Sequence, residues 1–124
     1  MAAILLVEDV EILRTVLSKF LKSAGHVVTE CAGGDEARRT AAVKTFDLIV
    51  TDLWMRDGDG LAFIRSQATG GRSPPVIAMT GGDPSVTQSK SGEFARQAGA
   101  TLILSKPVTK TEILNAVGMA LVAA

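Results

Sequence analysis

The sequence predicts an α/β fold in which helices cover both faces of a parallel sheet. Short apolar runs alternate along the chain with segments whose apolar residues recur at helical spacing. The runs are apolar almost throughout, as is typical of strands that are buried on both faces. A third observation sets the size, because 124 residues with 47% hydrophobic content can build one sizeable core without disulfides or structural metals.

The first half of the chain predicts three strands and two helices. The run AAILLV stops at Glu8, and the next segment carries apolar residues from Ile12 to Leu21 at helical spacing before Gly25 closes the helix. The second helix is rich in alanine, and the third strand is apolar apart from the aspartate at each end. The predicted elements are a strand over 2–7, a helix over 11–25, a strand over 26–31, a helix over 33–45 and a strand over 46–52.

The second half continues the alternation with three helices and two strands. Residues 81–93 are rich in Gly, Ser and Thr, so we expect the helix after the fourth strand to start late, near Gly92, or to be mobile. The last helix opens at TKTE, where Thr109 and Glu112 match a capping box. The predicted elements are a helix over 60–68, a strand over 74–79 that ends at Thr80, a helix over 92–99, a strand over 100–105 and a helix from 109 to 121.

Five strands joined by right-handed crossovers favour the flavodoxin-like strand order 2-1-3-4-5. In such sheets, ligands bind at the carboxyl ends of the strands where the strand order reverses, which here is between the first and third strands. The first strand ends at Glu8 and Asp9, and the third ends at Asp52. The fourth and fifth strands end at Thr80 and Lys106, so side chains suited to chemistry gather at one edge of the sheet.

These side chains suit a metal ion and a phosphoryl group together. Carboxylates crowded into a crevice repel one another unless a cation enters. Mg²⁺ takes oxygen ligands, which fits Asp9 and Asp52 as direct ligands and Glu8 acting through water. Lys106 offers a compact charge, and Thr80 a hydroxyl, to phosphoryl oxygens. Aspartyl carboxylates can form acyl phosphates, so we expect Asp52 to be the nucleophile.

Four other residues are interpreted as structural. Cys31 and His26 are the single cysteine and the single histidine of the chain, and isolated residues of these types are usually packing or surface residues. Asp57 and Asp59 lie in RDGDG, which has the composition of a turn, and Asp59 is placed to cap the next helix.

Composition argues against two classes of partner. Thirteen basic residues balance thirteen acidic residues, so no general field draws the chain to nucleic acid or to an anionic membrane. The sequence shows neither a leader pattern nor a long apolar span, and its one cysteine cannot form an internal disulfide. These observations predict a cytoplasmic protein.

Four motifs closely resemble those of the receiver domains of two-component response regulators, over nearly the whole chain. They are ILLVEDV with the acidic pair, DLIVTDLWMRDGDG with the phosphoacceptor, VIAMTGG with the switch threonine, and LSKP with the lysine and proline. The resemblance implies that Asp52 accepts a phosphoryl group from a histidine kinase or a histidine phosphotransfer protein. It also implies an Mg²⁺ ion held by Glu8, Asp9, Asp52 and the backbone carbonyl of Trp54.

The same resemblance implies how the site is used. Thr80 and Lys106 bind the phosphoryl oxygens, and the Lys106–Pro107 peptide is cis. Phosphorylation adds about −1.5 to −2 charges near pH 7 and switches the surface of helix 4, strand 5 and helix 5 for binding a downstream protein. The chain is then a switch and not an enzyme. We expect a single receiver domain over 1–124 without an output domain, as in stand-alone regulators of the chemotaxis type.

The chain departs from the usual receiver pattern at several positions. Ile103 stands three positions before the lysine, where the family usually has an aromatic residue whose rotamer reports the switch. The segment from Thr80 to Lys106 is a few residues longer than usual, and Arg56 replaces a frequent proline. Trp54 flanks the expected phosphoryl site, where it either slows the approach of hydrolytic water or is an exposed aromatic of the loop.

Two other functions compete with the phosphoacceptor hypothesis. Phosphatases of the haloacid dehalogenase type also combine a strand-end aspartate, a lysine and Mg²⁺, but they need a second aspartate two residues after the nucleophile, where this chain has Trp54. A receiver-like binding module that is never phosphorylated is the second alternative. The intact set of acidic, hydroxyl and lysine residues weighs against it.

Overall fold

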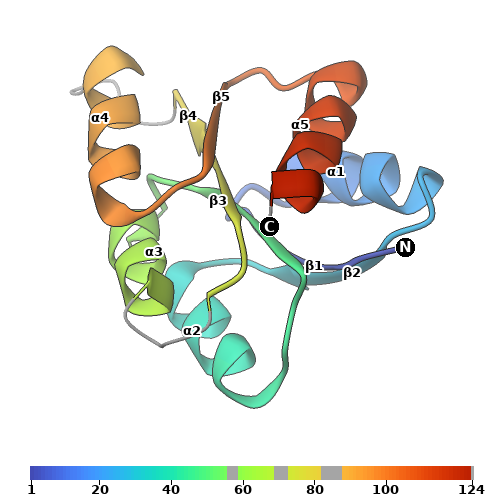
Figure 1. The fold of residues 1–124 in the computed structure, drawn as a ribbon, viewed down its shortest axis with the longest axis horizontal. Helices are drawn as coiled ribbons and strands as arrows, with labels where there is room; N and C mark the ends of the chain where they lie inside the picture. The colour runs from blue at the N-terminus through green and yellow to red at the C-terminus, as the bar shows by residue number, and fades with distance from the viewer. Residues whose placement is uncertain (56–58, 69–72, 82–87, 124) are drawn as a thin grey trace.

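A computed structural model describes residues 1–55, 59–68, 73–81 and 88–123 of the chain (Figure 1). Strands and helices alternate throughout, as the sequence predicts. The strands are β1 (Ala3–Val7), β2 (Val27–Cys31), β3 (Leu48–Asp52), β4 (Val76–Thr80) and β5 (Leu102–Ser105). The helices are α1 (Glu11–Ser23), α2 (Gly34–Val43), α3 (Gly60–Ala68), α4 (Gln88–Ala98) and α5 (Lys110–Ala123).

The five strands form one parallel sheet in the order β2-β1-β3-β4-β5. This confirms the predicted α/β, flavodoxin-like fold. The register aligns the carboxyl ends of the strands: Val7 of β1 pairs with Cys31 of β2 and with Thr51 of β3. Asp52 pairs with Met79 of β4. The residues that follow β1 and end β3 therefore meet at one edge of the sheet, which is where the order reverses.

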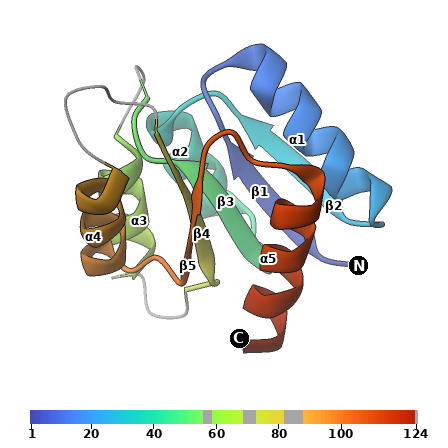
Figure 2. The same ribbon diagram turned by 90° about the horizontal axis from the view of Figure 1, so that it is seen from above.

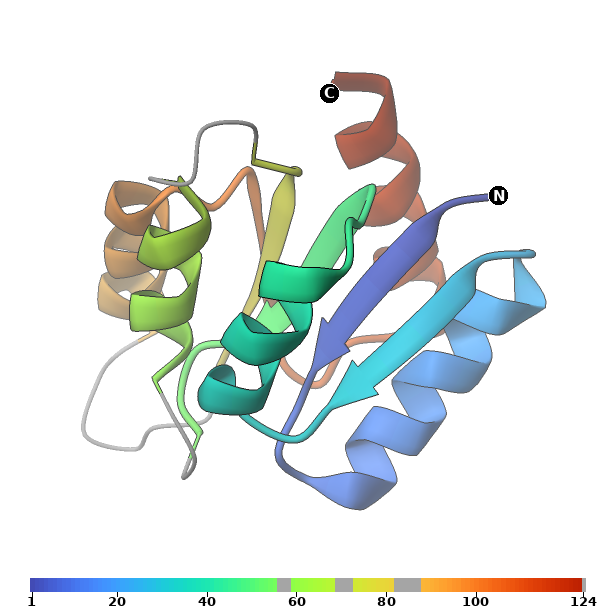
Figure 3. The same ribbon diagram turned by 90° about the horizontal axis from the view of Figure 1, so that it is seen from below.

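Helices cover both faces of the sheet (Figures 2 and 3). Helices α1 and α5 lie on one face, and α2, α3 and α4 lie on the other. Alternate residues of β1 point to opposite faces, so Ile4 and Leu6 join the core under α1 and α5, while Leu5 and Val7 join the core under the other three helices. All four are fully buried, which explains why the strand is apolar throughout. None of the helices within the described ranges is long and apolar enough to span a membrane.

Two predicted helix ends have the expected geometry. Gly25 adopts a positive φ of 90° after α1, a conformation that favours glycine, and its N–H donates to the carbonyl oxygen of Lys22 at 2.9 Å. At the start of α5, the backbone N–H of Thr109 donates to Oε1 of Glu112, and the N–H of Glu112 donates to Oγ1 of Thr109, both at 3.1 Å. The capping box is thus confirmed.

Helix α4 begins at Gln88, earlier than the predicted start near Gly92. The prediction of a late start rested on glycine and serine content, and intrinsic propensity is a weak guide when a helix packs on a sheet. Ala95 and Ala98 are buried in the core under α4, and this packing supports the helix despite its composition. Residues 82–87 lie outside the described part of the chain.

The apolar pattern of α1 is wider than its buried face. Leu17 and Leu21 are buried, whereas Ile12 is 73% exposed and Val16 is 40% exposed. Helical spacing therefore identified the helix but overestimated how much of it packs on the sheet.

Candidate functional site

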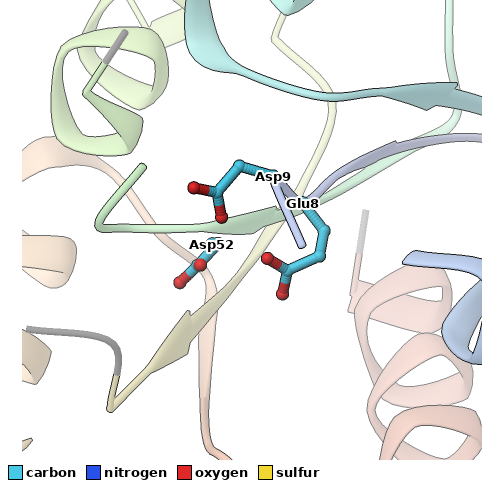
Figure 4. A group of neighbouring side chains, drawn as sticks. All are labelled: Glu8, Asp9 and Asp52. Atoms are coloured by element: carbon cyan, nitrogen blue, oxygen red, sulfur yellow. The ribbon is translucent and has the colours of Figure 1, made fainter. Parts of the chain in front are cut away.

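Three carboxylates meet at the carboxyl edge of the sheet (Figure 4). Glu8 and Asp9 follow β1 and Asp52 ends β3, and one carboxylate oxygen from each lies within 4.8 Å of the others. Glu8 is completely buried, Asp52 is 2% exposed and Asp9 is half-buried. The structure thus brings together the acidic residues that the strand order placed at this edge. Burying charges is costly unless an opposite charge or a metal compensates them.

Lys106 supplies a positive charge to two of these carboxylates. Its Nζ donates to Oε1 of Glu8 at 2.6 Å and to Oδ2 of Asp52 at 2.9 Å. The lysine follows β5, and its backbone N–H donates to the carbonyl oxygen of Thr80 at 2.8 Å. The Lys106–Pro107 peptide is cis, as the resemblance predicted. Residues from both ends of the chain therefore form one ion-pair cluster.

The pKa values in this cluster reflect burial and charge together. Burial raises the pKa of Glu8, the hydrogen bond from Lys106 opposes that rise, and the charge of Asp52 reinforces it; the net direction is upward. Burial alone would lower the pKa of Lys106, but its hydrogen bond with Glu8 and the charge of Asp52 outweigh burial and raise it. Lys106 therefore stays charged over the whole neutral range, as a group that binds an anion requires.

Thr80 lies at the same edge but points its hydroxyl to the neighbouring strand. It ends β4 and is buried, and its Oγ1 donates to the carbonyl oxygen of Leu104 at 3.5 Å. That distance is long for a hydroxyl donor, so the bond is weak. Thr80 is thus linked to β5 through this hydroxyl and to the residue after β5 through the backbone bond from Lys106.

Gly60 is a site residue that sequence reasoning missed. It begins α3, and its N–H donates to the carbonyl oxygen of Leu53 at 3.0 Å. A Cβ at this position would lie 2.8 Å from Cα of Leu53 and closer still to the carbonyl oxygen of Asp52, so only glycine fits. The composition of the motif RDGDG indicates a turn and does not single out Gly60. The only local signal is that Gly60 is the second glycine of this motif, seven residues after Leu53, and this spacing does not reveal that the two backbones approach closely.

The loop after β3 has two further described residues of interest. Trp54 is half-buried and packs against the core under α2, α3 and α4, so it is not an exposed aromatic of the loop. Asp59 caps α3 as predicted, because its Oδ1 accepts a hydrogen bond from the N–H of Leu61 at 2.7 Å. The predicted turn role of Asp57, and the departure at Arg56, fall outside the described residues.

Cys31 and His26 make structural contacts. Nδ1 of His26 accepts a hydrogen bond from the N–H of Ala2 at 3.1 Å. Cys31 is buried, its Sγ lies 3.4 Å from Oγ1 of Thr40, and burial raises the pKa of its thiol. A thiol with a raised pKa is a poor nucleophile at neutral pH, so neither residue competes with the carboxylate cluster as a reactive group.

Comparison with known protein families identifies the class of domain to which this fold and this edge belong. The family model of the response regulator receiver domain matches residues 4–118. The chain therefore belongs to the receiver domain family of two-component response regulators, whose members are generally switches and not enzymes.

Curated relatives are longer proteins that contain this domain. The sensory/regulatory protein RpfC of Xanthomonas campestris pv. campestris is 31% identical over 115 residues, which are 90% of this chain and 15% of that protein. The transcriptional regulatory protein PdtaR of Mycobacterium tuberculosis is 30% identical over 118 residues, which are 94% of this chain and 55% of that protein. The chain thus spans a small part of the first and about half of the second.

Solved receiver structures match almost end to end. The receiver domain of the sensor histidine kinase PA1611 from Pseudomonas aeruginosa, solved with a magnesium ion coordinated in its active-site cleft, is 31% identical with a TM-score of 0.83, and the match covers 97% of each chain. The chemotaxis response regulator CheY4 of Vibrio cholerae is 27% identical with a TM-score of 0.86, and the match covers 97% of this chain and 98% of that one.

Proposed function

We propose that this chain is a phosphoacceptor switch in which Asp52 takes a phosphoryl group from the phosphohistidine of a kinase or a phosphotransfer protein. The observation that carries the proposal is the position of Asp52. It is a nearly buried carboxylate that ends a central strand, lies 2.9 Å from a lysine ammonium and shares a cluster with two further carboxylates. Membership of the receiver family supports the same assignment.

The transfer needs no acid or base of its own. An oxygen of Asp52 attacks the phosphorus atom, the bond between phosphorus and the histidine nitrogen breaks, and the electron pair leaves with the imidazole. The protein's part is to hold the carboxylate in line with the donor and to stabilise charge on the three equatorial oxygens. Asp52 is well suited to this part, because the N–H of Leu53 donates to its Oδ1 at 2.9 Å and leaves Oδ2 facing Lys106.

The carboxylate cluster fits a hard divalent cation. Its ligand atoms are all oxygens, they lie within 4.8 Å of one another, and Mg²⁺ prefers one or two carboxylates with several retained waters. The ligands we propose are Asp9 and Asp52 directly, Glu8 through water and the backbone carbonyl of Trp54. A bound Mg²⁺ would neutralise charge on the phosphoryl oxygens and on the carboxylates.

Lys106 and Thr80 complete the proposed site on its other side. Lys106 already contacts Asp52, so a phosphoryl group on that carboxylate would lie within reach of its ammonium. Among the described residues, the long bond to Leu104 is the one that holds the hydroxyl of Thr80, and exchanging that bond for one to a charged oxygen is favourable. These contacts would be made by the phosphorylated state alone.

A shift of Thr80 toward the phosphoryl group would be transmitted to the surface formed by α4, β5 and α5. Thr80 is bonded to Leu104 of β5 and to Lys106, the residue after β5, and Ile103 of β5 lies against α4, where a Cβ built at Gly92 would be 3.7 Å from Cδ1 of Ile103. The aromatic residue that the family usually has in this strand is absent, so we propose that coupling runs through the backbone of β5. The partner of this surface would be a downstream protein.

Small-molecule phosphorylation tests the proposal. The protein is incubated with acetyl phosphate and Mg²⁺, and intact mass is measured for the wild type, for Asp52→Asn and for Asp47→Asn. We expect one added phosphoryl group that needs Mg²⁺, is lost in Asp52→Asn and is retained in Asp47→Asn. Asp47 is a matched control, because it precedes the same strand at the opposite end.

Other outcomes point to the competing functions. Turnover of phosphomonoesters without a stable adduct would indicate a phosphatase, although the residue two positions after Asp52 is Trp54, which offers no acid or base. No adduct and no turnover, with Mg²⁺ present, would indicate a binding module that is not phosphorylated. Either result would contradict the phosphoacceptor assignment.

A further inference from the structure

An arginine of α1 reaches the backbone of the acidic pair. Arg14 lies in the first turns of the helix, and its Nη1 donates to the carbonyl oxygen of Glu8 at 2.8 Å. The N–H of the same residue, Glu8, donates to the carbonyl oxygen of Cys31 at 3.0 Å. The peptide groups on both sides of Glu8 are therefore held, one by β2 and the other by the arginine.

The arginine is itself held by Glu30 in the edge strand β2. Nε of Arg14 lies 3.6 Å from Oε1 of Glu30, Ser18 donates to Oε2 of Glu30 at 3.1 Å, and Nζ of Lys22 lies 4.0 Å from the same oxygen. Arg14, Ser18 and Lys22 follow one another at intervals of four residues, so they share one face of α1. Three side chains of the helix thus converge on one carboxylate.

The charges in this group do little for global stability. The side chains of Arg14 and Glu30 are 19% and 36% exposed, and ion pairs that water reaches contribute little. The group does fix the orientation of the Arg14 guanidinium. Its donors lie in one rigid plane, and the contact with Glu30 holds one edge of that plane.

The acidic pair needs such a constraint. Successive side chains of an extended chain point in opposite directions, yet the carboxylates of Glu8 and Asp9 both lie beside Asp52 (Figure 4). The chain leaves the extended conformation here, because β1 ends at Val7 and a bend begins at Asp9. The carbonyl oxygen of the Glu8–Asp9 peptide is the atom that Arg14 binds. We infer that Arg14 is a positioning residue: it holds this peptide turned so that both carboxylates face the cation site, and Glu30 anchors it.

This inference rests on the proposed function only for the identity of the ligand, a divalent cation. The positioning role and a purely electrostatic role of Arg14 predict opposite changes in Mg²⁺ affinity when Arg14 is replaced. Removing a positive charge near carboxylates should strengthen cation binding if only charge mattered. If Arg14 positions the acidic pair, its removal should weaken cation binding instead, because residues that orient metal ligands affect metal affinity about 10–100-fold.

Calorimetric titration with Mg²⁺ tests the inference on the unphosphorylated chain. Arg14→Met keeps the aliphatic stem of the side chain and removes its donors and its charge. Lys22→Met makes the same charge change at the same glutamate, two turns further from the site backbone. We expect the Kd for Mg²⁺ to rise about tenfold in Arg14→Met, and to stay unchanged or to fall slightly in Lys22→Met. Thermal melting with EDTA checks that both variants are folded.

The results separate this inference from the proposed function. If the wild type binds Mg²⁺ and Arg14→Met binds it as tightly or more tightly, Arg14 acts by charge alone and the positioning role is overturned while the proposed function stands. If the wild type does not bind Mg²⁺, both fail. If Arg14→Met does not fold, the variant Glu30→Gln provides the test, since it leaves Arg14 in place without its anchor. Weaker Mg²⁺ binding by Glu30→Gln would support the positioning role of Arg14, and unchanged binding would overturn it.

Discussion

The two ends of the sheet differ in whether their charged side chains are exposed or buried. At the amino end, a groove of about 1000 Å³ is lined by residues that include Lys44, Phe46 and Asp47. Lys44 and Asp47 are exposed; the lysine donates to Oγ1 of Thr29 at 3.0 Å, and the aspartate accepts from the N–H of Ala3 at 2.8 Å. At the carboxyl end, the charged groups are buried and converge on one point.

This difference shows why a hollow alone is a poor guide to the candidate site of this molecule. A wide groove is a usual first candidate for a ligand site. Here its charged residues are solvated and paired locally, which stabilises the loops and leaves little to recognise a ligand. Buried charges that converge are costly to fold, and proteins keep them mainly where they serve function.

The largest effect is expected at Gly60. In Gly60→Ala the new Cβ would overlap the backbone of Asp52 and Leu53, so we expect a loss of about 2 kcal/mol or more in the free energy of unfolding, together with the loss of phosphorylation. Gly118→Ala is the matched control, because a Cβ at this position in α5 meets nothing within 4 Å. It should gain up to about 1 kcal/mol from helix propensity. Urea unfolding measures both, and equal stability of the two variants would contradict the close approach at Gly60.

A pair of lysines gives the most direct comparison of the two ends. Lys106→Met leaves Glu8 and Asp52 buried without their cation, so we expect a loss of about 1–3 kcal/mol near neutral pH and slower phosphorylation by about tenfold or more. Lys44→Met should change stability by less than about 0.5 kcal/mol and leave phosphorylation unchanged.

The loss in the free energy of unfolding caused by Lys106→Met should grow as the pH rises. Without the lysine, the pKa of Glu8, already raised by burial, rises further. A carboxyl whose pKa is higher in the folded state favours folding only while it is protonated, so its contribution is present below its ordinary pKa and is lost as the pH rises through the folded value. Unfolding curves at several pH values should show a larger deficit above neutral pH than near pH 5. A deficit that grows toward acid would contradict this cause.

At Trp54 we expect a similar effect on stability but a smaller effect on phosphorylation. The ring is half-buried beside the loop that follows Asp52, so Trp54→Ala should cost about 1–3 kcal/mol of packing and let water reach the phosphoryl group more easily. We expect the phosphorylated protein to lose its phosphoryl group faster in Trp54→Ala than in the wild type, and Trp54→Phe to lie between them. Equal lifetimes in all three would mean that the ring serves packing alone.

The smallest effect is expected at Cys31, which ends β2 at the carboxyl edge but belongs to the core. Cys31→Ala should leave phosphorylation unchanged. In the wild type, burial and a raised thiol pKa should make labelling by a disulfide reagent near pH 8 slow until urea unfolds the chain. Fast labelling of the folded protein would show that this edge opens more widely than the buried thiol indicates.

The sequence was enough to predict which strand ends meet at one edge of the sheet. Apolar runs that end in Glu8, Asp52 and Thr80 gave the strands, and the strand order placed their ends at one edge. The roles of these residues and of Lys106 stay predictions, but their proximity is a structural fact. Periodicity succeeds here because burial on both faces leaves a strong and simple pattern.

Features that depend on contacts between distant segments could not be predicted. Gly60 is needed because two backbones approach each other, and the anchoring of Arg14 by Glu30 joins two elements whose relative position no local pattern encodes. The start of α4 was missed for a related reason, since packing of Ala95 and Ala98 outweighs a composition that is typical of a loop.

The contact between Lys106 and Glu8 joins residues 98 positions apart in the chain. Such a contact closes a loop of most of the polypeptide, and contacts of this kind form after the local ones during folding. A partly folded chain that lacks β5 would therefore have its acidic residues but not the lysine that neutralises them. Under the proposed function, such a chain would accept a phosphoryl group more slowly than the folded protein, because the ammonium of Lys106 would be missing from the site.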